Sequence, residues 1–317
     1  MLEFNKQVPL KEGNNDLLTI GELLIDLISE EYDCTKSSTY HRHFGGSPSN
    51  IAMNVRKLGG SAQVVAAVGK DPWGTYLIEQ LVNAGIDTST IQQVDESTSL
   101  VVVNRSKGTP TPIFYRGADF HITYNSALEE ALLNSKIVHF SCWPLSKNPS
   151  RLTIEKVLHT VREHNLLVGF DPNYHPGIWE DGHDGVNYIK SLLPNVDIVK
   201  PSRDDAERLF GRDTDENQVE KFLSLGAKVV ILTLGQDGLI ASNGKESIYL
   251  PSLAVEIQDT TGAGDAFWAG LYTAICKGYT LGKAIHIGIA ASAYKLKFVG
   301  AVVDFPSLEE LAQLYGI

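Results

Sequence analysis

The stretch DTTGAGDAFWAG, residues 259–270, sets two glycines and an aspartate directly before an apolar run. It predicts a loop followed by a helix that runs from about Asp265 to a stop at Gly278. Glycines let the backbone turn sharply, and the free N–H groups and dipole at the start of a helix favour an anion. Asp265 either caps this helix or accepts a proton from a hydroxyl that attacks a phosphoryl group.

Three common enzyme signatures do not fit the sequence. The dinucleotide fingerprint needs glycine at position 267, where Phe267 stands. A P-loop needs Ser or Thr after Gly-Lys, but Asp, Glu and Ala follow the Gly-Lys pairs of this chain. In FGGSPSNIAMNVRKLGG, residues 44–60, Ser49 takes the final glycine position of a nucleophile elbow, which disfavours a serine hydrolase. Ser47 or Ser49 can instead cap the helix that follows.

Composition narrows the class of protein. The chain has 317 residues, of which 43% are hydrophobic, and a formal net charge of −11. The acidic balance argues against nucleic acid and anionic membranes as partners. No apolar run approaches the roughly 18 residues of a spanning helix, and the N-terminus lacks the pattern of a secretory signal. Three scattered cysteines give no disulfide framework, so we expect a cytoplasmic protein.

Short apolar segments alternate with helical patterns, which predicts a doubly wound α/β fold with ligands at the carboxyl ends of its strands. The strand candidates are apolar almost throughout, as in a parallel sheet covered on both faces, and read LLTIGELLIDLIS, AQVVAAVG, KIVHFSC, LLVGFDPN, VDIVKPS and AKVVILTLG. Residues 27–44 and 98–117 read as strands without intervening helices, with KGTP as a hairpin turn, and predict a small inserted β-structure. Residues 1–16 are polar and predict a tail.

The two glycine stretches together resemble the paired signatures of the PfkB (ribokinase-like) carbohydrate kinase family. Further motifs agree in order: GELLIDL, FYRGAD, DPNYHPGIW, VKPSRDDAERLFG and LTLGQDG. The resemblance extends from Gly21 to about Pro306. It implies one kinase domain over residues 1–317, a three-layer αβα sandwich with a mostly parallel central sheet, and an inserted β-lid.

The resemblance also implies catalytic and sugar-binding residues. Asp265 is expected to be the base that takes the proton of the sugar hydroxyl. An anion hole for the transferring phosphoryl is expected from Gly262, Ala263 and Gly264. The residues expected to bind sugar hydroxyls are Asp26, Gly45, Gly46 and Asn50. Arg116 is expected to reach from the lid to the substrate or the transferring phosphate, its alternative being a solvated arginine at a strand edge.

For the nucleotide, the family pattern implies ATP contacts from Lys200, Thr233, Gly235 and Gly238, together with Gly262 and Gly264. Lys200 could equally be a surface lysine with its ammonium in water. Asp259 and Thr261 resemble the start of a monovalent-cation site for K⁺ beside the anion hole, with a downstream half at residues 298–302. Asp259 could instead only satisfy N–H groups of its own loop.

Two positions depart from the family pattern. Many members carry Asn-x-x-Glu where this chain has Ser202 and Asp205, so Asp205 is expected to replace the glutamate that organises Mg²⁺ through water. His175 stands where sugar kinases often have arginine.

The motifs are most like the fructokinase branch, which implies transfer from ATP to D-fructose and a homodimer formed through the lid. Alternatives are 2-keto-3-deoxygluconate kinase and kinases of ribose, 5-dehydro-2-deoxygluconate or aminoimidazole riboside. A non-catalytic sugar or nucleotide sensor is a different class, which the intact Gly262–Asp265 stretch disfavours.

Overall fold

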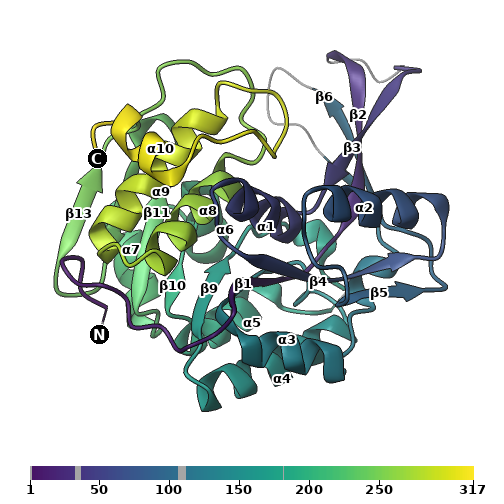
Figure 1. Ribbon diagram of the computed structural model, residues 1–317, viewed down its shortest axis with the longest axis horizontal. Helices are drawn as coiled ribbons and strands as arrows, with labels where there is room; N and C mark the ends of the chain where they lie inside the picture. Colours follow the sequence, from purple (N-terminus) through teal and green to yellow (C-terminus); the bar gives the residue numbers. More distant parts are fainter. Residues whose placement is uncertain (1, 33–36, 106–111, 181) are drawn as a thin grey trace.

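The computed structural model describes residues 2–32, 37–105, 112–180 and 182–317. Its main sheet has nine strands in the order β13-β12-β11-β10-β9-β8-β1-β4-β5 (Figure 1). All neighbours pair in parallel except at β11-β12-β13. The bounds are β1 Asn15–Ile20, β4 Ala62–Gly69, β5 Ile91–Val94, β8 Ser135–Ser141, β9 Leu167–Asp171, β10 Ile198–Val199, β11 Val229–Thr233, β12 Leu239–Ser242 and β13 Ser247–Leu250.

Helices cover both faces of this sheet, because each inner strand is apolar on both sides. In β1, Leu17 belongs to one buried cluster and Leu18 and Ile20 to the other. The first cluster lies under α1 Ser47–Lys57, α2 Pro72–Asn83, α8 Ala263–Cys276, α9 Leu281–Lys295 and α10 Leu308–Leu314. The second lies under α3 Ser126–Asn134, α4 Ser150–Glu163, α5 Gly185–Leu192, α6 Arg203–Phe210 and α7 Asp215–Ser224. The expected three-layer α/β sandwich is confirmed.

A second, smaller sheet projects from one end of the molecule (Figure 1). Its order is β3-β2-β6-β7, with β2 Leu24–Tyr32, β3 Tyr40–Gly45, β6 Leu100–Arg105 and β7 Pro112–Tyr115. Two antiparallel pairs, β2-β3 and β6-β7, join through the parallel pair β2-β6. This is the inserted β-structure expected from residues 27–44 and 98–117. The predicted KGTP turn lies outside the described residues.

The N-terminal segment is not the free polar tail that we expected. Phe4 and Val8 are buried in the core cluster beneath α9. The N–H groups of Leu281 and Gly282 donate to the carbonyls of Lys6 and Phe4, at 2.9 and 2.8 Å. Burial of Phe4 and Val8, together with these hydrogen bonds, holds the segment on the domain.

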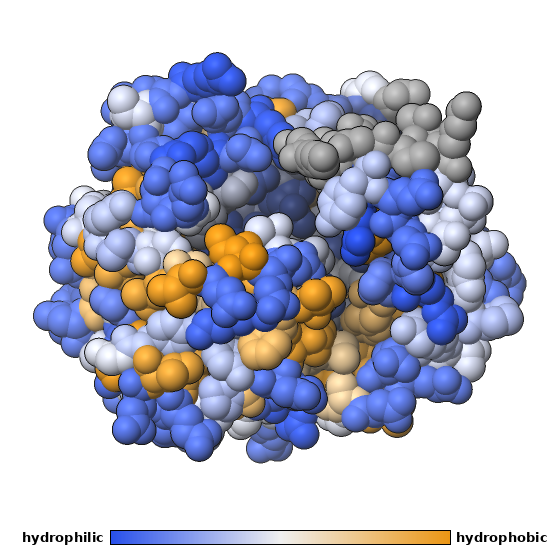
Figure 2. Space-filling view, turned by 90° about the horizontal axis from the view of Figure 1, so that it is seen from above, coloured by the Kyte–Doolittle hydropathy of each residue, from blue (hydrophilic) through white to orange (hydrophobic). Residues whose placement is uncertain are grey.

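The fold brings the start of α8, the start of α1 and the second sheet together at the carboxyl ends of the parallel strands. Figure 2 views the molecule from above, on the side where α10 and the second sheet lie in Figure 1, and shows that this face is hollowed. No helix in the described ranges is both long and apolar enough to cross a membrane.

Candidate active site

The carboxylate of Asp265 lies in the first turn of α8 and is held by α1. It accepts a hydrogen bond from the Ser47 hydroxyl at 2.6 Å and one from the Asn50 amide at 3.0 Å. The amide oxygen of Asn50 is buried and has no partner among the described residues. A polar atom in that position is ready to accept from a ligand hydroxyl.

Three carboxyl groups around this point have raised pKa values. Burial raises the pKa of Asp265 to about 6, against the hydrogen bonds from Ser47 and Asn50. Burial and the charge of Asp265 raise the pKa of Asp26 to about 7. Burial, with smaller contributions from the charges of Asp119 and Asp265, raises the pKa of Glu22 to about 8. Glu22 accepts from the Ser47 N–H at 3.1 Å and is a site residue that the sequence analysis missed.

Gly45 and Gly46, at the end of β3, lie too close to neighbouring residues to carry a side chain. A Cβ on Gly45 would lie 2.4 Å from the Asp26 carboxylate, so any larger residue would displace that side chain. Gly46 has a φ of 114° and a Cβ there would lie 2.3 Å from the carbonyl oxygen of Glu22. Gly45 thus leaves room for the Asp26 carboxylate and Gly46 for the backbone of Glu22, while a contact of either glycine with the sugar stays a prediction.

The backbone turns sharply at Gly262, directly before α8. Gly262 is the N-cap residue with a left-handed φ of 73°, and a Cβ on it would lie 2.6 Å from Cα of Ala301. The Ala263 N–H bonds to the carbonyl of Thr260 at 3.2 Å, while the next N–H groups of a helix start have no acceptor within the helix. The ammonium of Lys200 lies 3.3 Å from where a Cβ of Gly264 would be. A buried cation therefore stands beside these N–H groups.

Lys200 is not the surface lysine considered above. Its side chain is 5% exposed, and its ammonium lies 2.9 Å from the carboxylate of Asp171 at the end of β9. Asp171 also accepts from the indole N–H of Trp268 on α8 at 2.8 Å. Asp171 was missed as a site residue, although its position as the last residue of the strand in GFDPN is a signal that could have identified it.

A cavity of about 270 Å³ adjoins the start of α8. It brings together four of the residues expected to contact the nucleotide, Thr233, Gly235, Gly238 and Gly264. Its walls are largely apolar, with side chains from Leu239, Ile257, Phe267, Ile289 and Leu296. An apolar slot that ends at the N-terminus of a helix suits a planar base attached to phosphates.

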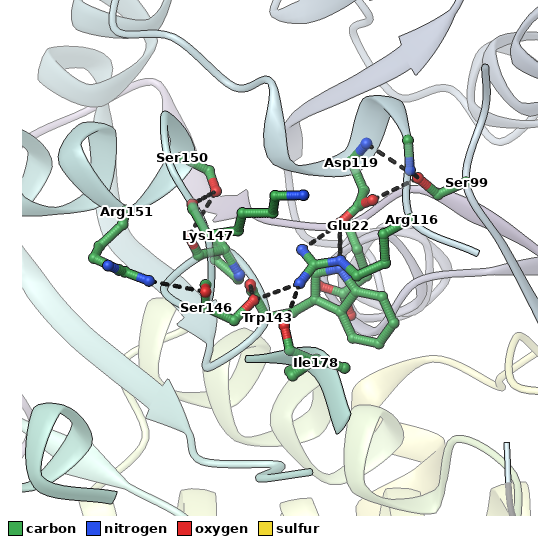
Figure 3. A network of polar contacts seen from close by, with 12 residues as sticks. Glu22, Ser99, Arg116, Asp119, Trp143, Ser146, Lys147, Ser150, Arg151 and Ile178 are labelled. Carbon is green, nitrogen blue, oxygen red and sulfur yellow. Dashed lines mark hydrogen bonds and ion pairs between the residues drawn. The ribbon is translucent and has the colours of Figure 1, made fainter. Parts of the chain in front are cut away.

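Arg116 is held in a network of polar contacts (Figure 3). Its guanidinium donates to Asp119 at 2.9 Å, to the Ser146 hydroxyl at 2.6 Å and to the Ile178 carbonyl at 2.8 Å. The side chain is 10% exposed, so the alternative of a solvated strand-edge arginine is wrong. Asp119 is fully buried and also accepts from the indole of Trp143 at 2.6 Å. The network ties the end of β7 to the main domain, and a direct role of Arg116 toward substrate or phosphate stays a prediction.

The Asp205 carboxylate is occupied as a helix cap. It accepts from the N–H and hydroxyl of Ser202, at 3.0 and 2.6 Å, and from the Tyr174 N–H at 2.7 Å. Within the described residues no three His, Cys, Asp or Glu side chains gather as a metal centre. Mg²⁺ that arrives with nucleotide phosphates needs few protein ligands. Asp205 does not fit as a direct ligand, and its action on Mg²⁺ through water stays a prediction.

Asp259 lies in the loop before α8 and has all its oxygens engaged. The carboxylate accepts from the N–H groups of Thr261 at 2.9 Å and Gly300 at 2.8 Å. Its carbonyl accepts from the ammonium of Lys295 at 2.6 Å. Lys295 was also missed, because a lysine near a helix end normally points to water. His175, the other departure from the family pattern, accepts from the Gly177 N–H at 3.1 Å and packs against Phe114.

Comparison with known proteins identifies the family of this chain. The family model described as pfkB family carbohydrate kinase matches residues 14–308. The ATP-dependent 6-phosphofructokinase of Thermoanaerobacterium thermosaccharolyticum is 52% identical over 318 residues, which cover 100% of this chain and 99% of that one.

Two solved structures of sugar kinases are also similar to this chain. The fructokinase of Halothermothrix orenii is 39% identical with a TM-score of 0.80, covering 89% of this chain and 100% of that one. An uncharacterised sugar kinase of Pyrococcus horikoshii, solved in complex with ATP, is 32% identical with a TM-score of 0.81, covering 94% of this chain and 97% of that one.

Proposed function

The chain belongs to the pfkB family of carbohydrate kinases and is an ATP-dependent sugar kinase, and we propose that its acceptor is a fructose unit, with D-fructose 6-phosphate as the leading substrate. The observation that carries the chemistry is the Asp265 carboxylate, held by Ser47 and Asn50 at the start of α8. This carboxylate, with a pKa of about 6, lies in the first turn of α8 near the buried Lys200.

In the proposed reaction, a hydroxyl oxygen of the sugar attacks the γ-phosphorus of ATP while Asp265 takes the hydroxyl proton. The bond from phosphorus to the β,γ-bridging oxygen breaks and ADP leaves. Charge on the transferring group is met by the N–H groups that follow Gly262 and by Lys200. When bound with ATP, Mg²⁺ neutralises phosphate charge. In fructose 6-phosphate the 6-hydroxyl is already esterified, so the 1-hydroxyl is the primary hydroxyl left to react.

Fructose 6-phosphate needs a group that binds the phosphate at its far end, and we propose that the second sheet provides it. His43 lies directly across from Asp26 in the β2-β3 register, so both side chains project from the same face. His41 projects from that face as well, two residues away. The pKa of His43 is lowered by burial and by the charges of His41 and Arg105, which therefore lie close to it. Arg105 carries the positive charge at this rim, and His43, whose lowered pKa favours the neutral imidazole, can donate one N–H hydrogen bond to a phosphate, with His41 beside it.

D-Fructose itself is the second candidate, and it is the acceptor that the sequence motifs favoured. The 39% identical fructokinase supports it. So does the set of acids around Asp265, because Glu22, Asp26 and Asp265 suit neutral hydroxyls better than a second anion.

Release of ADP from Mg-ATP tests both acceptors, with 2-keto-3-deoxygluconate, 5-dehydro-2-deoxygluconate, ribose and aminoimidazole riboside in the same panel. We expect the highest kcat/KM with fructose 6-phosphate. Arg105→Ala should then raise the KM for fructose 6-phosphate and leave that for fructose unchanged. Arg42→Ala is the matched control, because Arg42 lies on the opposite face and stacks on Tyr76 at 3.8 Å. Greater turnover of fructose would reject the leading acceptor and favour the second one.

We also propose that the whole chain acts as one kinase domain with the second sheet as its lid and dimer contact. Large apolar side chains are exposed there, with Tyr32 58%, Ile113 47% and Tyr115 57% accessible. Ile113→Glu should therefore shift the protein from dimer to monomer in light scattering behind gel filtration. A monomeric wild-type protein would contradict the proposal.

A further inference from the structure

Lys295 is a buried lysine whose ammonium lies against the loop that leads into α8. It is the last residue of α9, and no part of its side chain is exposed. The ammonium donates to the carbonyl oxygen of Asp259 at 2.6 Å and lies 3.8 Å from its carboxylate. A buried ammonium is costly unless it is paired, so these oxygens must provide its compensation.

The same loop is fixed from two other directions. The N–H of Gln258 donates to the carbonyl of Leu296 at 2.8 Å, and the carboxylate of Asp259 accepts from Thr261 and Gly300. Gly262, the N-cap of α8, follows one residue after Thr261. The position of the first N–H groups of α8 therefore depends on how Asp259 is held.

A free K⁺ ion does not fit the place where the sequence led us to expect one. A monovalent cation there would need the carbonyl and carboxylate oxygens of Asp259. Those oxygens are already in contact with the Lys295 ammonium and with the N–H groups of Thr261 and Gly300. A second positive charge beside the ammonium would be repelled, since both would share one carboxylate in a buried site.

We infer that Lys295 is a built-in replacement for the monovalent cation: its ammonium holds the Asp259 loop and the start of α8, so that phosphoryl transfer proceeds without K⁺. An ammonium group and a K⁺ ion carry the same charge and are similar in size, so one side chain can take the place of the ion. Lys295 acts as a positioning residue, because it reaches the phosphoryl group only through Asp259 and the helix start. The inference rests on the proposed role of Gly262–Asp265 in transfer.

The first test compares salts on the wild-type protein. ADP release with Mg-ATP and the best acceptor of the panel should be the same in KCl and in choline chloride at equal ionic strength. A several-fold increase in kcat with K⁺ would overturn the inference. The second test uses Lys295→Ala, which opens space for an ion. We expect kcat in choline chloride to fall about tenfold to a hundredfold, since a charged hydrogen bond is lost. K⁺ or NH₄⁺, but not Li⁺, should restore most of the rate.

Two further variants separate positioning from general damage. Lys295→Met fills the space with an uncharged chain, so it should lose activity as Lys295→Ala does but should not be rescued by K⁺. Lys277→Ala removes a lysine that pairs with Glu309 at 3.0 Å and should remain independent of K⁺. Equal activity of Lys295→Ala and wild type in choline chloride, or a loss that K⁺ and NH₄⁺ cannot reverse, would overturn the inference.

Thermal unfolding provides a readout that needs no turnover. K⁺, compared with choline, should raise the Tm of Lys295→Ala and leave the Tm of the wild type and of Lys295→Met unchanged. An unchanged Tm of Lys295→Ala in K⁺ would count against a vacated cation site. Because this measurement uses no acceptor, failure of the sugar panel would leave it intact, and the two failures can be told apart.

Discussion

Removing the Ser47 hydroxyl should shift the acidic limb of the pH–rate profile to higher pH. Asp265 must be ionised to take a proton, and burial places its pKa at about 6. The Ser47 hydroxyl, 2.6 Å away, and the Asn50 amide both stabilise the ionised form. In Ser47→Ala the carboxylate keeps the Asn50 contact but loses its shorter hydrogen bond.

The size of the shift follows from the strength of that bond. A hydrogen bond to a charged group contributes about 1.5–3 kcal/mol, and one pKa unit corresponds to about 1.4 kcal/mol. The pKa that sets the acidic limb should therefore rise from about 6 in the wild type by about one to two units in Ser47→Ala. At pH 6 the fraction of ionised Asp265 would fall from about one half to about one tenth or less.

The assay is ADP release, with kcat/KM measured from pH 5 to 9. The phosphate groups of the substrates also titrate near about 6, but they contribute equally to wild type and variant. Ser49→Ala is the matched control: Ser49 is buried on the same turn of α1, and its hydroxyl has no partner among the described residues. The reasoning is refuted if Ser47→Ala keeps the wild-type limb, or if Ser49→Ala moves it as far.

Four further changes test other parts of the site. Gly262→Ala should cost about 1–2 kcal/mol of stability from its left-handed backbone, seen in urea unfolding, and lower kcat further because the clash with Ala301 moves the helix start. Lys200→Met should lower kcat with ATP and lower the Tm, because it leaves Asp171 without its cation; a normal kcat would remove Lys200 from the transfer step. Arg116→Ala should weaken both kcat/KM and stability, whereas loss of stability alone would limit Arg116 to the Asp119 network. Glu22→Gln should weaken the dependence of the free energy of unfolding on pH. Protonated Glu22 contributes stability that is full below about pH 4.5 and is lost as the pH rises to about 8, so the free energies of unfolding at pH 5 and pH 9 should differ less in the variant than in the wild type.

The sequence was most informative where a local pattern dictates the structure. GAGD before an apolar run placed the start of α8 within two residues, because glycine conformation and helix capping act over a single turn. Continuous apolar strands likewise indicated a sheet covered on both faces, since each strand must supply both layers.

The contacts that sequence reasoning could not predict join residues that are far apart in the chain. Ser47 and Asp265 are 218 residues apart, and Lys295 meets Asp259 only because α9 packs beside α8. Taken alone, the segment KLKFVG after an apolar helix predicts a helix end whose lysines point to solvent. Glu22 gives no local signal either, because its raised pKa arises from burial that only the assembled fold creates. The N-terminal segment looked like a free polar tail in the sequence, but Phe4 and Val8 pack into the core cluster with residues of α9.

The raised pKa values of the three carboxyl groups also indicate why Asp265, rather than Glu22 or Asp26, would act as the base. At pH 7 a group with a pKa of about 6 is mostly ionised, whereas Glu22, at about 8, is mostly protonated. Burial acts on all three, but only Asp265 receives two side-chain hydrogen bonds that favour its charge. Asp26, at about 7, receives none that lowers its pKa and is further raised by the charge of Asp265. One acid is therefore ready to accept a proton while the other two can donate hydrogen bonds to sugar hydroxyls, and this division is made by α1.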